Sequence, residues 1–150
     1  MLLCYCIDTS KLEVSHTLES GQKLISQNGN YVLNMQRDGN LVVYYKKATS
    51  GWGPLWSSKT AGQGSSPYKL RMQSDNNLVI YDNSPTAIWS TSVFIGKDGQ
   101  QWEKPAFAVM QNDGNFVVYD GSNAIMWETA TDGGTTGIYG SGRKHEKGTY

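Results

Sequence analysis

The chain has 150 residues, the size of a single domain, and its 13 Lys and Arg balance 13 Asp and Glu, so its formal net charge is +0. This balance argues against nucleic acid or an anionic membrane as a partner. No apolar stretch is long enough for membrane insertion across a bilayer. Only 17% of the residues are charged, while Gly, Asn, Gln, Ser, Thr and Tyr are plentiful, which favours short strands joined by turns.

The first residues, MLLCYCIDTSK, are a poor secretory signal, because no basic residue precedes the short apolar run and Asp8 ends it. Without a signal peptide, we expect a cytoplasmic protein or one that is extracellular by unconventional secretion. Cys4 and Cys6 lie two residues apart and cannot easily bridge each other, so no disulfide framework is expected. Each is either a free or buried thiol or part of an intermolecular bridge.

One ten-residue pattern occurs three times along the chain, at 35–44 (MQRDGNLVVY), 72–81 (MQSDNNLVIY) and 110–119 (MQNDGNFVVY). Its copies are about 37 residues apart, and a tryptophan with a short polar pair follows each one: Trp56, Trp89 and Trp127. An internal repeat of about 37 residues holds about four short strands, so we expect about twelve in all and negligible helix.

Turn chemistry predicts that each copy is a hairpin with a three-residue loop. In the first copy Gln36 pairs with Asn40 across the loop, and Asn34 pairs with Val42. The last loop position needs a residue that tolerates positive φ, and the copies place Gly39, Asn76 and Gly114 there.

Strand alternation then sorts each hairpin into two faces. The apolar face of the first copy carries Leu33, Met35, Leu41 and Val43, which we expect to meet the tryptophans in a common core. The other face presents two amides, a carboxylate, a phenol and one valine. These groups donate and accept hydrogen bonds in fixed directions, which suits a ligand dense in hydroxyls.

The pattern Gln-x-Asp-x-Asn-x-Val-x-Tyr in three tandem copies resembles the signature of the bulb-type (monocot) mannose-binding lectin family. The resemblance covers roughly residues 14–131, with 1–13 as an N-terminal extension and 132–150 as a Gly-rich C-terminal tail. It implies an all-β fold, the β-prism II, with three four-stranded antiparallel sheets in pseudo-threefold symmetry. It also implies metal-independent recognition of terminal α-D-mannose on glycans and glycoproteins, without a cofactor.

The resemblance implies one role for each signature position. The aspartates and second amides hold the axial 2-hydroxyl of mannose: Asp38, Asp75, Asp113, Asn40, Asn77 and Asn115. The glutamines bind the 3-hydroxyl and the tyrosines the 4-hydroxyl: Gln36, Gln73, Gln111, Tyr44, Tyr81 and Tyr119. The valines lie against the ring carbons: Val42, Val79 and Val117.

The chain departs from the plant members of that family at the hairpin loop of the first repeat. Those members carry a cysteine of a disulfide where this chain has Gly39, so it resembles a non-plant branch without the bridge. We expect a homodimer, and the sequence leaves open whether residues 129–150 exchange between subunits, as in plant homologues. The tail itself reads as a solvated segment. Trp52 and Trp102, in two enlarged loops, either stack on further sugars or pack against the sheets.

The alternatives to a sugar-binding lectin are a glycosidase, a calcium-binding protein and a module that binds no sugar. A glycosidase needs two converging carboxylates, whereas each repeat offers one signature aspartate, so no catalytic residues are expected. A calcium site needs more charge than one carboxylate supplies, so no metal ligands are expected either. A structural or interaction module that has the fold but binds no sugar is the remaining alternative.

Overall fold

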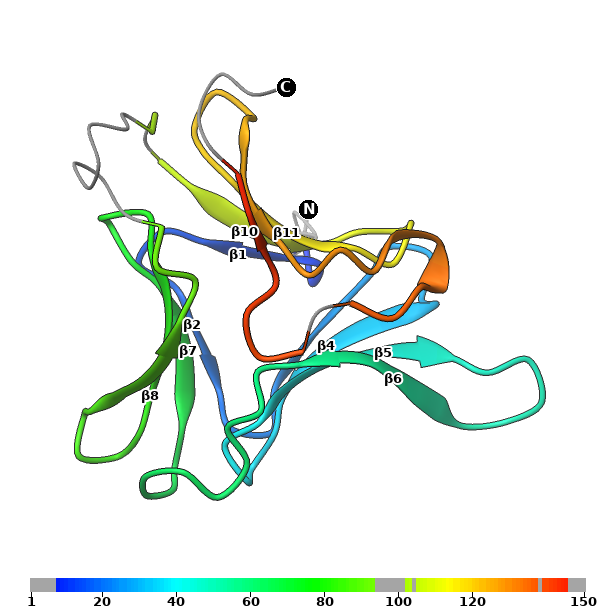
Figure 1. Cartoon of the computed structure of the whole chain (residues 1–150), viewed down its shortest axis with the longest axis horizontal. Coiled ribbons are helices and arrows are strands. Elements are labelled where there is room, and N and C mark those ends of the chain that lie inside the picture. Colours follow the sequence, from blue (N-terminus) through cyan, green and yellow to red (C-terminus); the bar gives the residue numbers. More distant parts are fainter. Residues whose placement is uncertain (1–7, 94–101, 104, 138, 146–150) are drawn as a thin grey trace, which may run out of the picture.

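A computed structural model describes residues 8–93, 102–103, 105–137 and 139–145. Three antiparallel sheets form the walls of a triangular prism (Figure 1), each named here by the copy of the repeat that it carries. The first sheet contains β3 (Lys23–Ile25), β4 (Tyr31–Met35), β5 (Leu41–Lys46) and β6 (Trp52–Ser57). The second contains β2 (Thr17–Glu19), β7 (Lys69–Met72), β8 (Leu78–Tyr81) and β9 (Ala87–Ser90). The third contains β1 (Lys11–Glu13), β10 (Phe107–Met110), β11 (Phe116–Tyr119), β12 (Ile125–Glu128) and the short β13 (Arg143–Lys144).

These sheets confirm the expected all-β class with three sheets of four strands, to which β13 adds a short fifth strand on one sheet. Within the described residues, the helical content is a single 3₁₀ turn at Asp132–Gly134. No described helix is long and apolar enough to cross a membrane.

The three predicted hairpins form with the predicted geometry. The backbone N–H of Gln36 donates to the Asn40 carbonyl at 2.9 Å, and the second and third copies repeat this bond at 2.9 and 3.0 Å. Gly39, Asn76 and Gly114 have φ of 92°, 71° and 94°, so the last loop position does require the left-handed conformation.

A continuous N-terminal segment, residues 11–25, supplies one strand to every sheet. Its β1 pairs with β10, β2 pairs with β7, and β3 pairs with β4. The second and third repeats therefore supply three of the four expected strands, and the segment supplies the fourth. Because β1 and β10 are distant in sequence, the prism closes only through long-range pairing.

The core lies between the sheets, where the apolar hairpin faces meet around the three repeat tryptophans. Leu33, Met35, Leu41 and Val43 are completely buried, as predicted. The rings of Trp56, Trp89 and Trp127 lie 5.6–5.7 Å apart in three edge-to-face pairs. This geometry is favourable for aromatic rings and stabilises the junction of the sheets beyond simple burial.

Residues 139–145 of the C-terminal segment do not form a solvated tail: they return across the middle of the prism, in red in Figure 1. The N–H of Gly140 donates to the Ser57 carbonyl at 2.7 Å. The indole N–H groups of Trp89 and Trp127 donate to the carbonyls of Gly140 and Ser141 at 2.7 and 2.8 Å. The segment then forms β13 beside β12. Sequence composition missed this role, because the segment is held by backbone groups rather than by apolar side chains.

Candidate functional site

Each sheet brings its own copy of the signature together on its outward face. In the first sheet Gln36 and Asp38 lie at the β4–β5 hairpin and Val42 and Tyr44 follow on β5. Side chains two residues apart on a strand share a face, so the pattern Gln-x-Asp-x-Asn-x-Val-x-Tyr becomes one cluster. The three clusters lie on different walls of the prism and are therefore separate candidate sites.

The aspartates serve the hairpin turn in all three copies. One oxygen of Asp38 accepts the backbone N–H of Asn40 at 2.9 Å, and the other copies repeat this bond at 3.0 and 2.9 Å. The turn function of these residues is thus present, as in many hairpins. The side chains nevertheless remain exposed, so each turn also presents a carboxylate to solvent.

The second amide of the signature is held in one orientation by residues outside it. In the first sheet the Oδ1 atom of Asn40 accepts from the Ser58 hydroxyl and the Thr60 N–H, both at 3.2 Å. In the second, Asn77 Oδ1 accepts from the Thr91 hydroxyl at 2.9 Å. With the oxygen engaged, the amide nitrogen is the group left to face a ligand as a donor.

Sequence reasoning did not assign a role to these positioning hydroxyls, although it noted the polar pair after each tryptophan. The second member of that pair is the residue concerned: Ser58, Thr91 and Thr129. Each also accepts the backbone N–H that follows the asparagine, at 3.0–3.2 Å. The recurrence of the pair directly after each repeat tryptophan was the available signal.

The glutamine and tyrosine of each copy are bonded to each other. Tyr81 donates to Gln73 Oε1 at 2.9 Å and Tyr119 to Gln111 Oε1 at 2.8 Å, whereas in the first sheet the Gln36 amide donates to Tyr44. The valines beside them are only 1–4% exposed although they face outward. The valines therefore offer a sugar ring little accessible surface.

The third cluster differs from the other two because a glutamate replaces a serine. Glu128 lies opposite Val117, where the other sheets have Ser57 and Ser90. The amide of Asn115 donates to Glu128 Oε2, and the side chain of Asn115 is buried. The donor that the other sheets leave to face a ligand is here engaged within the protein.

The C-terminal segment completes this third cluster. His145 Nε2 lies 2.7 Å from Glu128 Oε1, and Arg143 lies 3.4 Å from the same oxygen. Burial, together with the negative charges of Asp113 and Glu128, raises the pKa of Tyr119. The expectation of one carboxylate per site is therefore wrong for the third sheet, where Asp113 and Glu128 both act on the same phenol.

The surroundings of the clusters also differ. A depression of about 280 Å³ in the second sheet is lined by Arg71, Gln73 and Tyr81 together with Ser15 and Ser74. In the third sheet Phe107 stacks on Tyr119 at 5.4 Å. The surroundings of the signature cluster are thus cationic in the second sheet and aromatic in the third.

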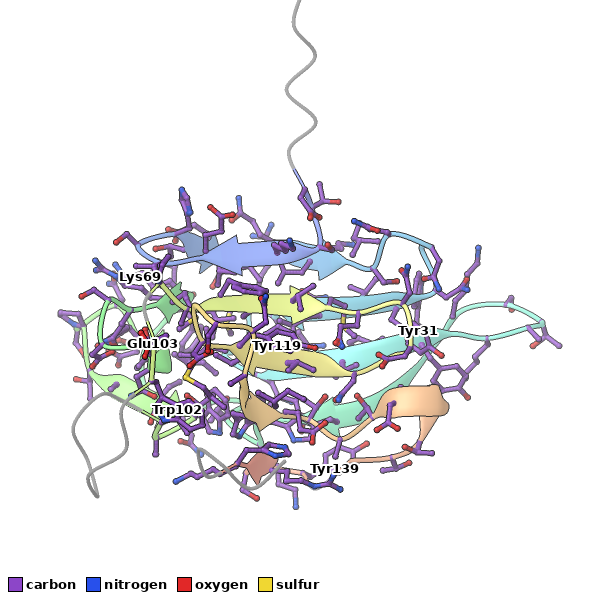
Figure 2. The ribbon with its side chains drawn as sticks, turned by 90° about the horizontal axis from the view of Figure 1, so that it is seen from above. Tyr31, Lys69, Trp102, Glu103, Tyr119 and Tyr139 are labelled. Carbon is purple, nitrogen blue, oxygen red and sulfur yellow. The ribbon has the colours of Figure 1, made fainter. Side chains whose placement is uncertain are left out.

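The two loop tryptophans have different surroundings. Trp52 is 44% exposed at the start of β6. Trp102 is 5% exposed, so the second of its two readings, packing against the sheets, is correct. Glu103 beside it, labelled with Trp102 in Figure 2, donates its N–H to Asp120 at 2.9 Å and accepts from the amide of Asn76 at 3.4 Å. This loop therefore bridges two hairpins.

Asp82 and Asp120, directly after the signature tyrosines, are structural acids that sequence reasoning missed. Hydrogen bonds from the Ser84 hydroxyl and from backbone N–H groups lower the pKa of Asp82 to about 2. Burial opposes ionisation of Asp120, but bonds from backbone N–H groups and Ser122 outweigh it and lower that pKa as well. Asp82 accepts the backbone N–H of Thr86 across the β8–β9 turn, and Asp120 accepts that of Ala124 across the β11–β12 turn.

In the described part of the chain, no three His, Cys, Asp or Glu side chains gather closely enough to hold a metal ion. Cys4 and Cys6, and with them the predictions about their bonding, lie outside the described residues.

No protein-family model and no curated protein matches the chain, whereas solved structures do. A monomeric monocot mannose-binding lectin from Gastrodia elata is 32% identical with a TM-score of 0.68, over 82% of this chain and 98% of that one. A lectin from Marasmius oreades is 33% identical with a TM-score of 0.66, over 81% and 91%.

The mannose-specific agglutinin of snowdrop (Galanthus nivalis), solved with methyl-α-D-mannoside, is 31% identical with a TM-score of 0.59, over 81% of this chain and 96% of that one. These structures share three-sheet architecture with the chain at a level of identity that also supports common descent. The chain belongs to the family of the bulb-type, or monocot, mannose-binding lectins and has their β-prism II fold.

Proposed function

We propose that the chain is a metal-independent lectin that binds terminal α-D-mannose at its three signature clusters. The observation that supports the proposal is the fixed second amide: the oxygens of Asn40 and Asn77 already accept hydrogen bonds within the protein, which leaves their nitrogens as the donors for a ligand. An amide donor beside a carboxylate acceptor is the arrangement that an axial hydroxyl can satisfy at both ends.

The same arrangement explains selectivity between epimers. Glucose carries its 2-hydroxyl in the equatorial direction, which leaves the asparagine and the aspartate without that partner. Unsatisfied polar groups in a site reject a ligand more strongly than a lost apolar contact does. We therefore expect mannosides to bind and glucosides to fail at the same concentration.

One site binds a monosaccharide weakly. Four to six hydrogen bonds at a net ~0.5–1.5 kcal/mol each leave little free energy after the cost of association. Millimolar affinity, about −4 kcal/mol, is the expected scale for one sugar. Several sites on one chain raise the avidity for a multivalent glycan by about 10²–10⁴-fold if they engage together.

The test is an NMR titration with methyl α-mannoside, with methyl α-glucoside as the matched ligand and EDTA added to one arm. Shifts of the backbone N–H signals of Asn40 and Asn77 with mannoside alone, unchanged by EDTA, support the proposal. The absence of shifts would instead favour the non-binding interaction module, and loss of the shifts in EDTA would refute metal independence. A glycan array with mannose as competitor then ranks the glycoprotein ligands.

We also propose that none of the clusters hydrolyses glycosides. The third sheet does contain two carboxylates, but Glu128 is already bonded to Asn115 and His145 rather than held ready as an acid. Release of reducing sugar from mannosides by the wild-type protein would contradict this statement.

The expected homodimer remains a prediction. β13 already covers the edge of β12 within one chain, so a dimer that exchanges C-terminal strands requires this segment to leave its own sheet. Sedimentation of the full chain, compared with a variant that lacks residues 137–150, measures whether association depends on the segment.

A further inference from the structure

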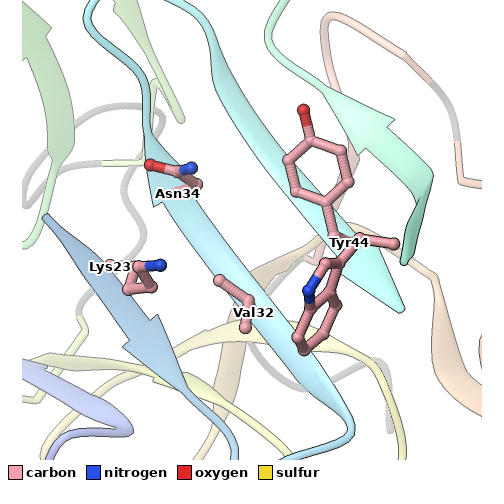
Figure 3. A pocket seen from close by; sticks show the side chains of 5 residues that line it. Lys23, Val32, Asn34 and Tyr44 are labelled. Atoms are coloured by element: carbon pink, nitrogen blue, oxygen red, sulfur yellow. The ribbon is translucent and has the colours of Figure 1, made fainter. Parts of the chain in front are cut away.

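A cavity of about 230 Å³ opens on the outward face of the first sheet, next to its signature cluster. Its lining side chains are Lys23, Val32, Asn34, Tyr44 and Trp52, and Figure 3 labels the first four. The volume is below the roughly 300 Å³ at which drug-sized pockets begin. It is on the scale of one sugar ring.

The cavity is continuous with the mannose site proposed for the same sheet. Tyr44 belongs to both, because it is the last member of the signature and also lines the cavity. A second depression of about 490 Å³ contains Gln36 and Asp38 of the signature and shares Lys23 and Asn34 with the cavity. A ligand longer than one sugar therefore finds a groove across β3, β4 and β5 rather than an isolated pit.

The lining combines an aromatic ring with hydrogen-bonding groups, which suits a sugar. Trp52 presents an exposed aromatic ring, on which the C–H face of a pyranose packs, as it does on Val32. The Oδ1 atom of Asn34 is buried and has no hydrogen-bond partner among the described residues. Such an atom costs free energy in the unliganded protein, and an amide that turns toward a hydroxyl in the cavity regains the bond. Lys23 adds donors at the rim.

The other two sheets do not repeat this lining. The register position of Asn34, opposite the signature valine, holds Arg71 in the second sheet and Val109 in the third. The register position of Val32, opposite the signature tyrosine, holds Lys69 in the second sheet and Phe107 in the third. Trp52 belongs to the long β5–β6 hairpin, whose counterparts β8–β9 and β11–β12 are shorter. This set of lining residues is thus specific to the first sheet among the described residues.

We propose that this cavity is a subsite for the second sugar of an α-linked mannose oligosaccharide, with Trp52 as its aromatic wall. The inference rests on the proposed mannose binding at Gln36, Asp38, Asn40, Val42 and Tyr44. With this subsite, the binding site on the first sheet distinguishes an oligosaccharide from a monosaccharide.

The test compares the wild-type protein with Trp52→Ala in titrations with methyl α-mannoside and with a panel of α-linked mannobiosides. An aromatic contact of this kind changes the affinity by about two- to tenfold. We expect at least one mannobioside to bind the first sheet of the wild type more tightly than the monosaccharide, and Trp52→Ala to lose this gain while it still binds methyl α-mannoside. Tyr45→Ala is the matched control, because Tyr45 is 37% exposed in the same hairpin but points to the opposite face by strand alternation.

A second variant, Asn34→Val, copies the residue of the third sheet. It removes a buried unsatisfied acceptor, so its midpoint of urea unfolding should not fall, while its preference for the mannobioside should decline. Tryptophan fluorescence gives a direct reading, since Trp52 is the most exposed tryptophan described and its emission should respond to the mannobioside more than to the monosaccharide.

The outcomes separate this inference from the proposed function. If the wild type binds mannoside and every mannobioside equally, and Trp52→Ala changes neither, the subsite is refuted and the lectin function stands. If the wild type binds none of these sugars, the proposed function fails first and the subsite fails with it.

Discussion

Replacing Glu128 with serine should convert the third site into one like the other two. Serine is the residue at this register position in the first and second sheets, at Ser57 and Ser90. In the wild type a mannoside at the third site must first release the Asn115 amide from the carboxylate. A hydrogen bond to a charged group contributes about 1.5–3 kcal/mol. This corresponds to about 10- to 150-fold weaker binding than at the other sites.

The assay is the NMR titration with methyl α-mannoside, read at one backbone N–H per site: Asn40, Asn77 and Asn115. In the wild type the first two should titrate in the millimolar range, while Asn115 barely shifts. In Glu128→Ser all three should titrate together. The reverse variant, Ser90→Glu, should weaken the second site by a similar factor and leave the first unchanged.

Two results would refute this reasoning. One is a wild-type Asn115 signal that titrates with the same dissociation constant as Asn40 and Asn77. The other is a third site that stays silent in Glu128→Ser although the variant remains folded. Because Glu128 also contacts Arg143, the variant Arg143→Ala controls for a loosened C-terminal segment; it should leave the third site weak.

Three further predictions concern stability. Gly39→Ala should lower the urea midpoint more than Gly62→Ala, since both glycines have positive φ but only at Gly39 would the new methyl meet a ring, that of Tyr68 at 2.8 Å. Stability should fall as the pH drops from about 4 toward 2. The hydrogen bonds that lower the native pKa of Asp82 and Asp120 stabilise the fold while these carboxylates are ionised, and this stabilisation is lost when they are protonated. Asp82→Asn should flatten the pH dependence of stability in urea titrations at several pH values. Deletion of residues 137–150 should lower the melting temperature and shift the tryptophan emission to the red, because the indoles of Trp89 and Trp127 lose their backbone acceptors; an unchanged melting curve would contradict the role of this segment.

The sequence predicted the hairpins and their faces because their determinants are local. A three-residue loop with Gly39, Asn76 or Gly114 at its end fixes the register of each hairpin, and alternation then assigns every side chain to a face. The signature residues gather on the outward faces for the same reason. Their roles in sugar binding remain proposals that the titrations address.

The features that the sequence did not predict depend on partners distant in the chain. The positions of β1 and β2 follow from pairing with β10 and β7, which no local pattern encodes. The C-terminal segment is held by backbone groups, so its glycine-rich composition resembled that of a free tail. The third site differs through Glu128, whose meaning appears only when Asn115 and His145 are placed beside it.

The way in which residues 11–25 contribute to all three walls limits how such a protein can grow. A copied repeat brings only three strands, so an extra wall would lack its outermost member unless the leading segment lengthened at the same time. Duplication of a repeat alone would thus leave an unpaired edge strand that can associate with other molecules. The number of walls is therefore set by residues 11–25 together with the number of repeats that follow.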